Sequence, residues 1–453
     1  MPYTQTTFAQ AQSMLLSRLS DSSGSFWSST PNGAGYNEIG GYIQEALRTW
    51  GAFTHYWRDR GSLQFIRFSP PFLDITNIKN ASGVAIRSYN VTDAQLLAMM
   101  EFHLLEPATP AAYSGSSMFA QSDFTQALQN RLNQFIFETG CTLTHSQQGV
   151  AGNQSRVVLP PTTAFVQRTG WISADSLSAA PLWRGDEMEM MAFMGTSWNT
   201  TSDQPQIFSV IASSPLSLQL APIPNANFIL DLLTLSNGPA LNPASGVLLK
   251  IPDESAWAIK WGAMADLLAK DGPAFDIQRA AYCEGRYREG VLAANSLPVV
   301  LQAQFQGIIA PIVSVLDLDQ SYPGWQGIKQ SGSPFILAPA GANLAAVYPI
   351  PDNTYDLVLD VVANPVVPAL GTDAIQLGQE ELDAVLDYAQ HLASFKLGGD
   401  EFQATQPLYN NFMKLALNYN QTLRASSKFL DIMWGASQRE NAMRPRKSVE
   451  AIQ

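Results

Sequence analysis

The sequence reads Pro222-Ile-Pro-Asn-Ala-Asn-Phe-Ile-Leu-Asp-Leu232 and, 127 residues later, Pro349-Ile-Pro-Asp-Asn-Thr-Tyr-Asp-Leu-Val-Leu359. Both stretches begin with a Pro-Ile-Pro turn and continue with apolar residues at every second position. This alternation is typical of a β-strand with one buried face. We therefore expect a strand after each turn, and similar local structure at both places.

The similarity extends over residues 198–290 and 325–417, which align without a gap at a shift of 127. Only 12 of the 93 aligned positions are identical, but the order of features also agrees. Each copy has an apolar strand, a proline turn, an alternating strand, a loop, and two helices separated by glycine. A chance likeness between two ordinary α+β units is the alternative. The matched pairs include Trp198 and Trp325, Phe208 and Phe335, Glu254 and Glu381, Gly272 and Gly399, and Tyr282 and Tyr409.

Helical periodicity dominates the first third of the chain and the end of each copy. Apolar residues recur at steps of three and four from Ile39 to Trp57, which predicts a helix there. Thr92 is expected to cap another helix, with Gln95 completing a capping box. In the first copy, 254–270 and 274–294 read as two further helices.

These patterns predict an α+β fold with four segments. Residues 1–181 form a mainly helical N-terminal region. Residues 182–300 and 301–430 form two duplicated modules, each a small antiparallel sheet or sandwich with a helix pair. Residues 431–453 form a basic C-terminal tail.

Composition limits the classes of function. The net charge of −12 argues against sequence-independent nucleic-acid binding by the whole surface, which needs Lys and Arg to displace counterions. Charged residues make up only 14% of the chain. Because subunit interfaces are depleted in Lys, Glu and Asp, this favours oligomerisation.

The two cysteines, Cys141 and Cys283, lack the spacing of a metal site, so we expect buried free thiols in a reducing compartment. The start, Met1-Pro-Tyr-Thr-Gln, has neither a basic nor an apolar leader region, and no apolar run is long enough to span a membrane. We expect a chain kept in the cytoplasm or built into a particle assembled there.

No motif for catalysis stands out in the sequence. GxxxxGK[ST], GxSxG, HExxH and CxxC are absent, and the four histidines lie far apart. Asp317 and Asp319 form a DxD pair that can hold a divalent metal, but acidic residues at the end of an apolar run are common. Glu187 and Glu189 lie in a methionine-rich stretch, which favours an interface or core role. We therefore predict no catalytic residue, cofactor or metal.

Two other groups of residues suggest packing and docking. Trp50, Trp57, Trp257 and Trp261 lie at helical spacing, which is more typical of helix packing than of sugar or base stacking. The tail concentrates positive charge, and such a tail can bind the acidic surface of a neighbour. A solvated tail without a partner is the alternative. The predicted partner-binding residues are Arg439, Arg444, Arg446 and Lys447.

Several stretches resemble virion structural proteins of tailed phages. Phe26-Trp27 and Tyr42-Ile-Gln-Glu-Ala-Leu-Arg-Thr-Trp50 look like the opening of such proteins. Leu218-Gln-Leu-Ala-Pro-Ile-Pro224, Trp257-Ala-Ile-Lys-Trp-Gly-Ala-Met-Ala-Asp-Leu-Leu268 and Ala281-Tyr-Cys-Glu-Gly-Arg-Tyr-Arg-Glu-Gly290 are similar to the helix, β-insertion, helix pattern of head-to-tail adaptor proteins. The second copy, 325–417, departs from that pattern, because ordinary adaptors carry one such unit.

The resemblance implies a virion protein that forms a homo-oligomeric ring, binds the portal and neck or tail proteins, and lines the DNA exit path. DNA would pass without sequence-specific binding, since an acidic lumen repels it. A different class, a glycan-binding or glycan-cleaving tail component, remains the alternative. Trp198, Trp325 and the acidic clusters would then form its site.

Overall fold

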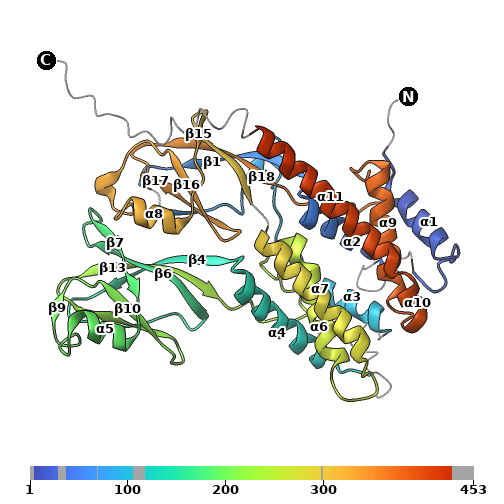
Figure 1. The fold of residues 1–453 in the computed structure, drawn as a ribbon, viewed down its shortest axis with the longest axis horizontal. Coiled ribbons are helices and arrows are strands. Elements are labelled where there is room, and N and C mark those ends of the chain that lie inside the picture. Colours follow the sequence, from blue (N-terminus) through green and yellow to red (C-terminus); the bar gives the residue numbers. More distant parts are fainter. Residues whose placement is uncertain (1–4, 29–36, 69, 106–117, 297–298, 431–453) are drawn as a thin grey trace.

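A computed structural model describes residues 5–28, 37–68, 70–105, 118–296 and 299–430 (Figure 1). The fold class is α+β, as predicted, with the long helices on one side of the molecule and the sheets on the other. The helices are α1 (Phe8–Arg18), α2 (Glu38–Thr54), α3 (Asp93–Leu104), α4 (Gln121–Thr139), α5 (Glu187–Met194), α6 (Ala256–Leu268), α7 (Ile277–Ser296), α8 (Val315–Ser321), α9 (Gln379–Ser394), α10 (Gly399–Ala404) and α11 (Gln406–Leu430). The strands are β1 (Arg58–Phe65), β2 (Phe72–Asp74), β3 (Lys79–Asn80), β4 (Leu143–Val150), β5 (Arg156–Val158), β6 (Thr163–Ser173), β7 (Ala179–Pro181), β8 (Trp183–Arg184), β9 (Ser202–Asp203), β10 (Ile207–Ile211), β11 (Ser217–Ala221), β12 (Ile223–Pro224), β13 (Phe228–Ser236), β14 (Val300–Phe305), β15 (Ile308–Ala310), β16 (Ile336–Ala340), β17 (Leu344–Tyr348) and β18 (Tyr355–Val362).

Each of the two larger sheets is built around one long strand. β13 lies between β4 and β6, and β18 lies between β1 and β14, with all four pairings antiparallel. These central strands are the two alternating segments that the sequence predicts. Leu230 and Leu232 in β13, like Leu357 and Leu359 in β18, are buried, because every second side chain points to the same face.

The two central strands pair with their neighbours in the same register. β4 pairs with residues 228–235 of β13, and β1 pairs with residues 355–362 of β18, which are the same positions shifted by 127. On the other side, β6 and β14 leave Gln167 and Leu301 out of the ladder at the same step, and β6 leaves out Ala164 as well. Such a bulge bends the strand and increases its twist. The two sheets therefore agree in pairing as well as in sequence order.

A second, smaller sheet covers one face of each larger sheet. β11 lies between β10 and β5, and β17 lies between β16 and β2. β5 pairs with residues 217–219 and β2 with residues 344–346, again 127 residues apart. An apolar core fills the space between each pair of sheets. Its members include Val157, Phe208, Leu218, Leu220 and Leu230 in one case, and Phe65, Leu337, Ala345, Leu357 and Leu359 in the other.

The two sheet pairs are nested along the chain. Residues 121–296, here called the inner unit, contain α4, both of the first pair of sheets, and helices α6 and α7. Residues 38–80 and 300–430, here called the outer unit, supply α2, β1 and β2 from one side and β14 to α11 from the other. The inner unit is thus an insertion between two halves of the outer unit.

The division at residue 181 that the sequence suggested does not follow the sheets. β6 and β7 lie before this point, yet both belong to the sheet of β13, which lies after it. β1 and β4 also lie within the region 1–181, which was expected to be mainly helical, and both pair with central strands from beyond it. Local periodicity missed them because their side chains are mostly polar on both faces, so no alternation of apolar residues marks either strand. The predicted tail, 431–453, lies outside the described residues.

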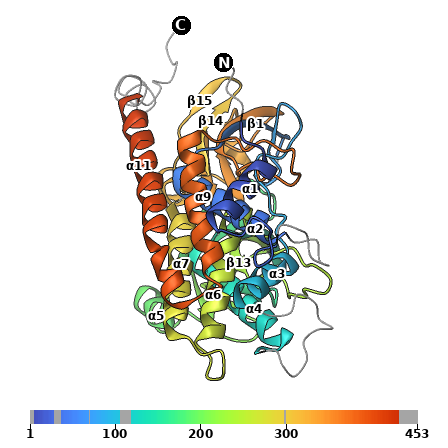
Figure 2. The same cartoon turned by 90° about the vertical axis from the view of Figure 1, so that its right-hand side faces the viewer.

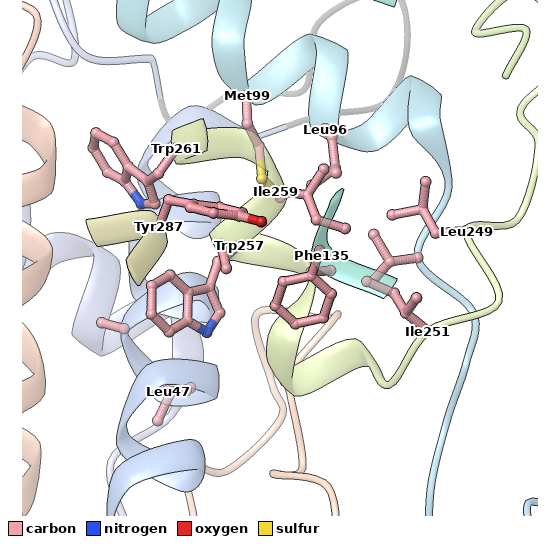
Figure 3. Packing of buried hydrophobic residues seen from close by; sticks show 14 of the residues in the cluster. Leu47, Leu96, Met99, Phe135, Leu249, Ile251, Trp257, Ile259, Trp261 and Tyr287 are labelled. Carbon is pink, nitrogen blue, oxygen red and sulfur yellow. The ribbon is translucent and has the colours of Figure 1, made fainter. Parts of the chain in front are cut away.

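The long helices form one layer beside the sheets (Figure 2). α6 packs against α7 and α4, and α9 packs against α11 and α2, so each unit contributes three helices. The predicted packing role of Trp50, Trp57, Trp257 and Trp261 is confirmed, since all four are buried. Figure 3 shows Trp257 and Trp261 of this core with Tyr287 and Phe135 around Ile259. The Thr92 capping box is confirmed as well, at the start of α3.

The close packing of α6 on α7 requires glycine at position 290. A Cβ atom there would lie 2.3 Å from the Cβ of Ala258, whereas a Cβ at Gly285, in the same helix, meets nothing within 4 Å. We expect Gly290→Ala to lower the free energy of unfolding by about 1–3 kcal/mol, because the helices must move apart. The matched control Gly285→Ala should leave stability unchanged or raise it by up to about 1 kcal/mol, since alanine favours helix. Urea denaturation measures both, and equal effects would contradict this account.

Candidate functional site

The four basic residues predicted to bind a partner, Arg439, Arg444, Arg446 and Lys447, lie outside the described residues. Their docking stays a prediction. Within the described ranges, polar groups from several separate elements gather at the junction where the inner unit meets the outer unit.

The tip of the β6–β7 hairpin forms the first part of this junction. The amide of Ile328 donates to the carbonyl of Ser176 at 2.9 Å, and the amide of Lys329 donates to the carbonyl of Leu177 at 3.3 Å. The backbone approaches so closely that a Cβ atom at Gly324 would lie 2.6 Å from the carbonyl oxygen of Ala179. The hairpin therefore docks, backbone to backbone, on the segment that follows α8.

A network of charged side chains forms the second part. Asp231 of β13 is fully buried, and its carboxylate accepts from Gln326 Nε2 at 2.8 Å and from Arg168 Nη1 at 3.3 Å. His145 Nε2 lies 2.6 Å from the same carboxylate. Arg168 also donates two hydrogen bonds, of 2.6 and 2.7 Å, to Asp319 of α8. Such a bidentate pair fixes orientation as well as adding energy.

The same network explains the DxD pair of the sequence. Asp319 accepts from Arg168 and from the indole Nε1 of Trp325 at 2.7 Å. Asp317 instead accepts from Ser314, the N-cap residue of α8, and completes the capping box there. The two carboxylates thus serve different partners. Among the described residues, no group of three or more His, Cys, Asp or Glu side chains is arranged to hold a metal ion.

The acidic, methionine-rich stretch forms α5, whose methionines divide between core and surface. Asp186 caps the helix, with Glu189 completing the capping box. Met190 is buried in a small cluster with Trp198, whereas Met188 is exposed. The stretch is therefore core on one side and open surface on the other.

Trp198 and Trp325, the tryptophans of the alternative glycan site, are both buried. Trp325 packs against Phe72 and lies under the guanidinium of Arg168. A sugar ring needs an open indole face, so these two side chains offer no platform for it.

A small hollow lies between the two halves of the outer unit and the loop before α6. Its polar groups hold segments together: Asp253 accepts from the amides of Asn90 and Val91 at 2.7 and 2.9 Å, and Asn364 donates to Glu254 at 2.8 Å. Arg87 pairs with Glu254 in the same place. These contacts hold the segments together, and the carboxylates of Asp253 and Glu254 both have partners.

The helix layer contains buried charges that the sequence analysis missed. Lys260 of α6 forms an ion pair with Glu45 of α2 and lies 3.0 Å from His103 Nε2, while Trp261 Nε1 donates to Glu45 at 2.8 Å. Arg286 of α7 binds the hydroxyls of two tyrosines in the outer unit. The signal was present, since Lys260 interrupts an apolar helix face, but its partner lies 215 residues away.

The thiols are poor nucleophiles. Cys141 and Cys283 are free and buried, as expected. Burial raises the pKa of Cys141 to about 11 and that of Cys283 further, so neither is a thiolate at neutral pH.

Neither the models of known protein families nor the curated proteins include a match to this chain. In the described part of the chain, no helix combines the length and the apolar character needed to cross a membrane.

The junction network predicts a stability effect. Asp319→Ala should lower the free energy of unfolding by about 3 kcal/mol, because it leaves the mostly buried Arg168 without its main partner. Asp271→Ala, which changes an exposed carboxylate in the loop after α6, should change it by less than about 0.5 kcal/mol. Chemical denaturation of both variants tests this, and the junction plays no such role if the two match.

His391 makes the stability depend on pH. Burial, and then the charge of Arg286, lower the pKa of His391 from 6.5 to about 3, and its ring nitrogens lie 2.8 Å from Tyr282 Oη and Thr405 Oγ1. Below pH 6.5 the unfolded chain therefore binds a proton at His391 that the folded chain does not bind. Stability should be complete above about pH 7 and should fall by about 2 kcal/mol between pH 7 and pH 5.

This dependence is measured by urea denaturation at several pH values. His391→Gln should reduce the slope between pH 7 and 5, whatever its effect on absolute stability. An unchanged slope would show that His391 is not the group responsible.

Proposed function

We propose that this chain is a non-enzymatic structural protein of a tailed-phage virion. In this role it forms a homo-oligomeric ring that connects head to tail, binds the portal and neck or tail proteins, and lines the DNA exit path. The resemblance of residues 26–50 and 218–290 to virion and adaptor proteins supports the family, and we further propose that the two units are duplicated copies.

One observation carries the assembly role: two units of the same strand register contact each other asymmetrically within one chain. The inner unit uses its β6–β7 hairpin, and the outer unit uses α8 and the segment after it. Contacts between unlike surfaces of like units are heterologous, and repetition of such contacts generates rings or filaments.

The chemistry of the described residues fits the same role. The buried ion pairs join elements far apart in sequence, as Lys260 and Glu45 do between the two units. The net charge of −12 suits a conduit that repels DNA and lets it slide. A basic lumen in the assembled ring would overturn the sliding role.

The proposal is tested on the purified full chain and on particles. We expect mass photometry to detect an oligomer and negative-stain electron microscopy to show a ring with a central channel. We also expect a gold-labelled antibody against the chain to mark phage particles at the neck. A chain that stays monomeric contradicts the ring, and a label at the distal end of the tail contradicts the connector position.

A further inference from the structure

The junction inside the chain uses only one end of each unit. The inner unit contributes its β6–β7 hairpin, and the outer unit contributes α8 with residues 324–327. The matching elements at the other two ends are the β14–β15 hairpin of the outer unit, and α5 with residues 197–200 of the inner unit. α5 and α8 occupy the same position along the chain of their units. α5 follows the β6–β7 hairpin, α8 follows the β14–β15 hairpin, and each precedes the next strand of its unit's smaller sheet.

The segment after α8 and its counterpart after α5 differ sharply in burial. Residues 324–327 are all buried beneath the inner unit. Of the matching residues 197–200, only Trp198 is buried. The α5 surface beside them is strongly apolar, with Met188 79% and Phe193 80% exposed. The inner unit thus leaves open, at residues 197–200, the positions that the outer unit covers at 324–327, and exposed apolar side chains of α5 lie beside them.

The β14–β15 hairpin shows the complementary pattern. Ile308 pairs with Phe305, and Ala180 in the other hairpin pairs with Trp171, at the same step of the two ladders. Ala180 is half-buried in the junction, whereas Ile308 is 73% exposed. Ile309, the next residue, is 52% exposed. A hairpin tip with two exposed isoleucines is suited to an apolar partner.

The three charged residues of the junction, Arg168, Asp231 and Asp319, have no charged counterparts at the two free ends. The positions that match Arg168 and Asp231 in the outer unit are Gln302 and Val358. The position that matches Asp319 in the inner unit is Ala192. A contact between the free ends would therefore not bury counterparts of these three charges, and burying an unpaired charge is the main penalty in such contacts.

The two units also face the same way. In Figure 1, β7 at the upper edge of the inner unit lies against α8, whereas β15 lies at the top of the molecule and α5 near its bottom. The free hairpin and the free α5 surface are therefore at opposite ends, so one chain cannot join them to each other. A second chain, stacked in the same direction, brings them together.

The helix layer does not offer the same opening. Lys260 of the inner unit pairs with α2, but the matching residue of the outer unit, Asp387, pairs with Arg18 of α1 in the same chain. α1 thus covers the position that a neighbouring chain would need. Because the helix layer is covered, we place the contact between copies on the sheets and on α5.

We propose that copies of this chain associate head to tail through the β14–β15 hairpin of one copy and α5 with residues 197–200 of the next. This contact uses, between chains, the counterparts of the elements that form the junction within a chain, with a shorter turn, residues 306–307, in place of the turn 174–178. The inference deepens the proposed function by naming the surfaces of the oligomer, and it rests on that function only for the expectation that the chain assembles.

The test uses two double variants of the full chain at exposed positions. Ile308→Ser with Ile309→Ser alters the hairpin, and Met188→Ser with Phe193→Ser alters α5. Leu370→Ser, at a residue that is 66% exposed elsewhere, is the control. By mass photometry, each double variant should lose the oligomer and the control should keep it. Thermal unfolding of all three should match the wild type, because the changed side chains are exposed.

Mixing the two double variants gives the sharpest result. Each retains one intact surface, so an equal mixture should form a species of two chains and nothing larger. Oligomers that persist in both double variants would overturn this interface and leave the ring standing. A mixture that stays monomeric would overturn the head-to-tail pairing of these surfaces. A wild-type chain that never assembles would overturn both the interface and the ring.

Discussion

The pairing of β1 with β18 holds the architecture together. It joins residues that lie 300 positions apart at Arg60 and Asp360, and it runs without interruption along the whole of β1. The outer unit closes only when these two strands meet. The inner unit, which lies between them in the sequence, must therefore fold without pairing with β1 or β18. The inner unit meets this condition, since each of its strands pairs with another strand from residues 121–296.

The buried charges act as ties between these nested parts. Glu45 with Lys260, Arg87 with Glu254, and Arg168 with Asp319 each connect a segment of the outer unit, or the loop that leads from it, to the inner unit. Burying a charge is costly unless the partner is present, so each pair penalises any arrangement in which the units are displaced. The ties therefore specify one relative placement of the units more than they add stability. This specificity suits the structural role that we propose.

The two units differ most where their surroundings differ. Inside the chain, the hairpin of the inner unit turns through Ala174-Asp-Ser-Leu-Ser178, and its sheet carries Arg168 and Asp231 at the junction with α8. At the free end, the corresponding hairpin ends in isoleucines and its sheet carries no matching charge. A permanent contact tolerates a buried ionic network because its geometry never changes. A contact that forms during assembly is better served by apolar groups, which need no exact alignment.

The sequence alone determined the local structure and the likeness of the two units. The capping box at Thr92, the helical stripe through Trp257 and Trp261, and the alternation after each Pro-Ile-Pro turn depend on neighbours within a few residues, so they can be read directly. Only the tertiary structure decided which strands flank β13 and β18. It also decided that one unit is inserted in the other, and that Lys260, Arg168 and Asp319 have partners. The physical reason is that strand pairing and buried ion pairs join distant residues, and the energy that selects one partner exists only after the chain has folded.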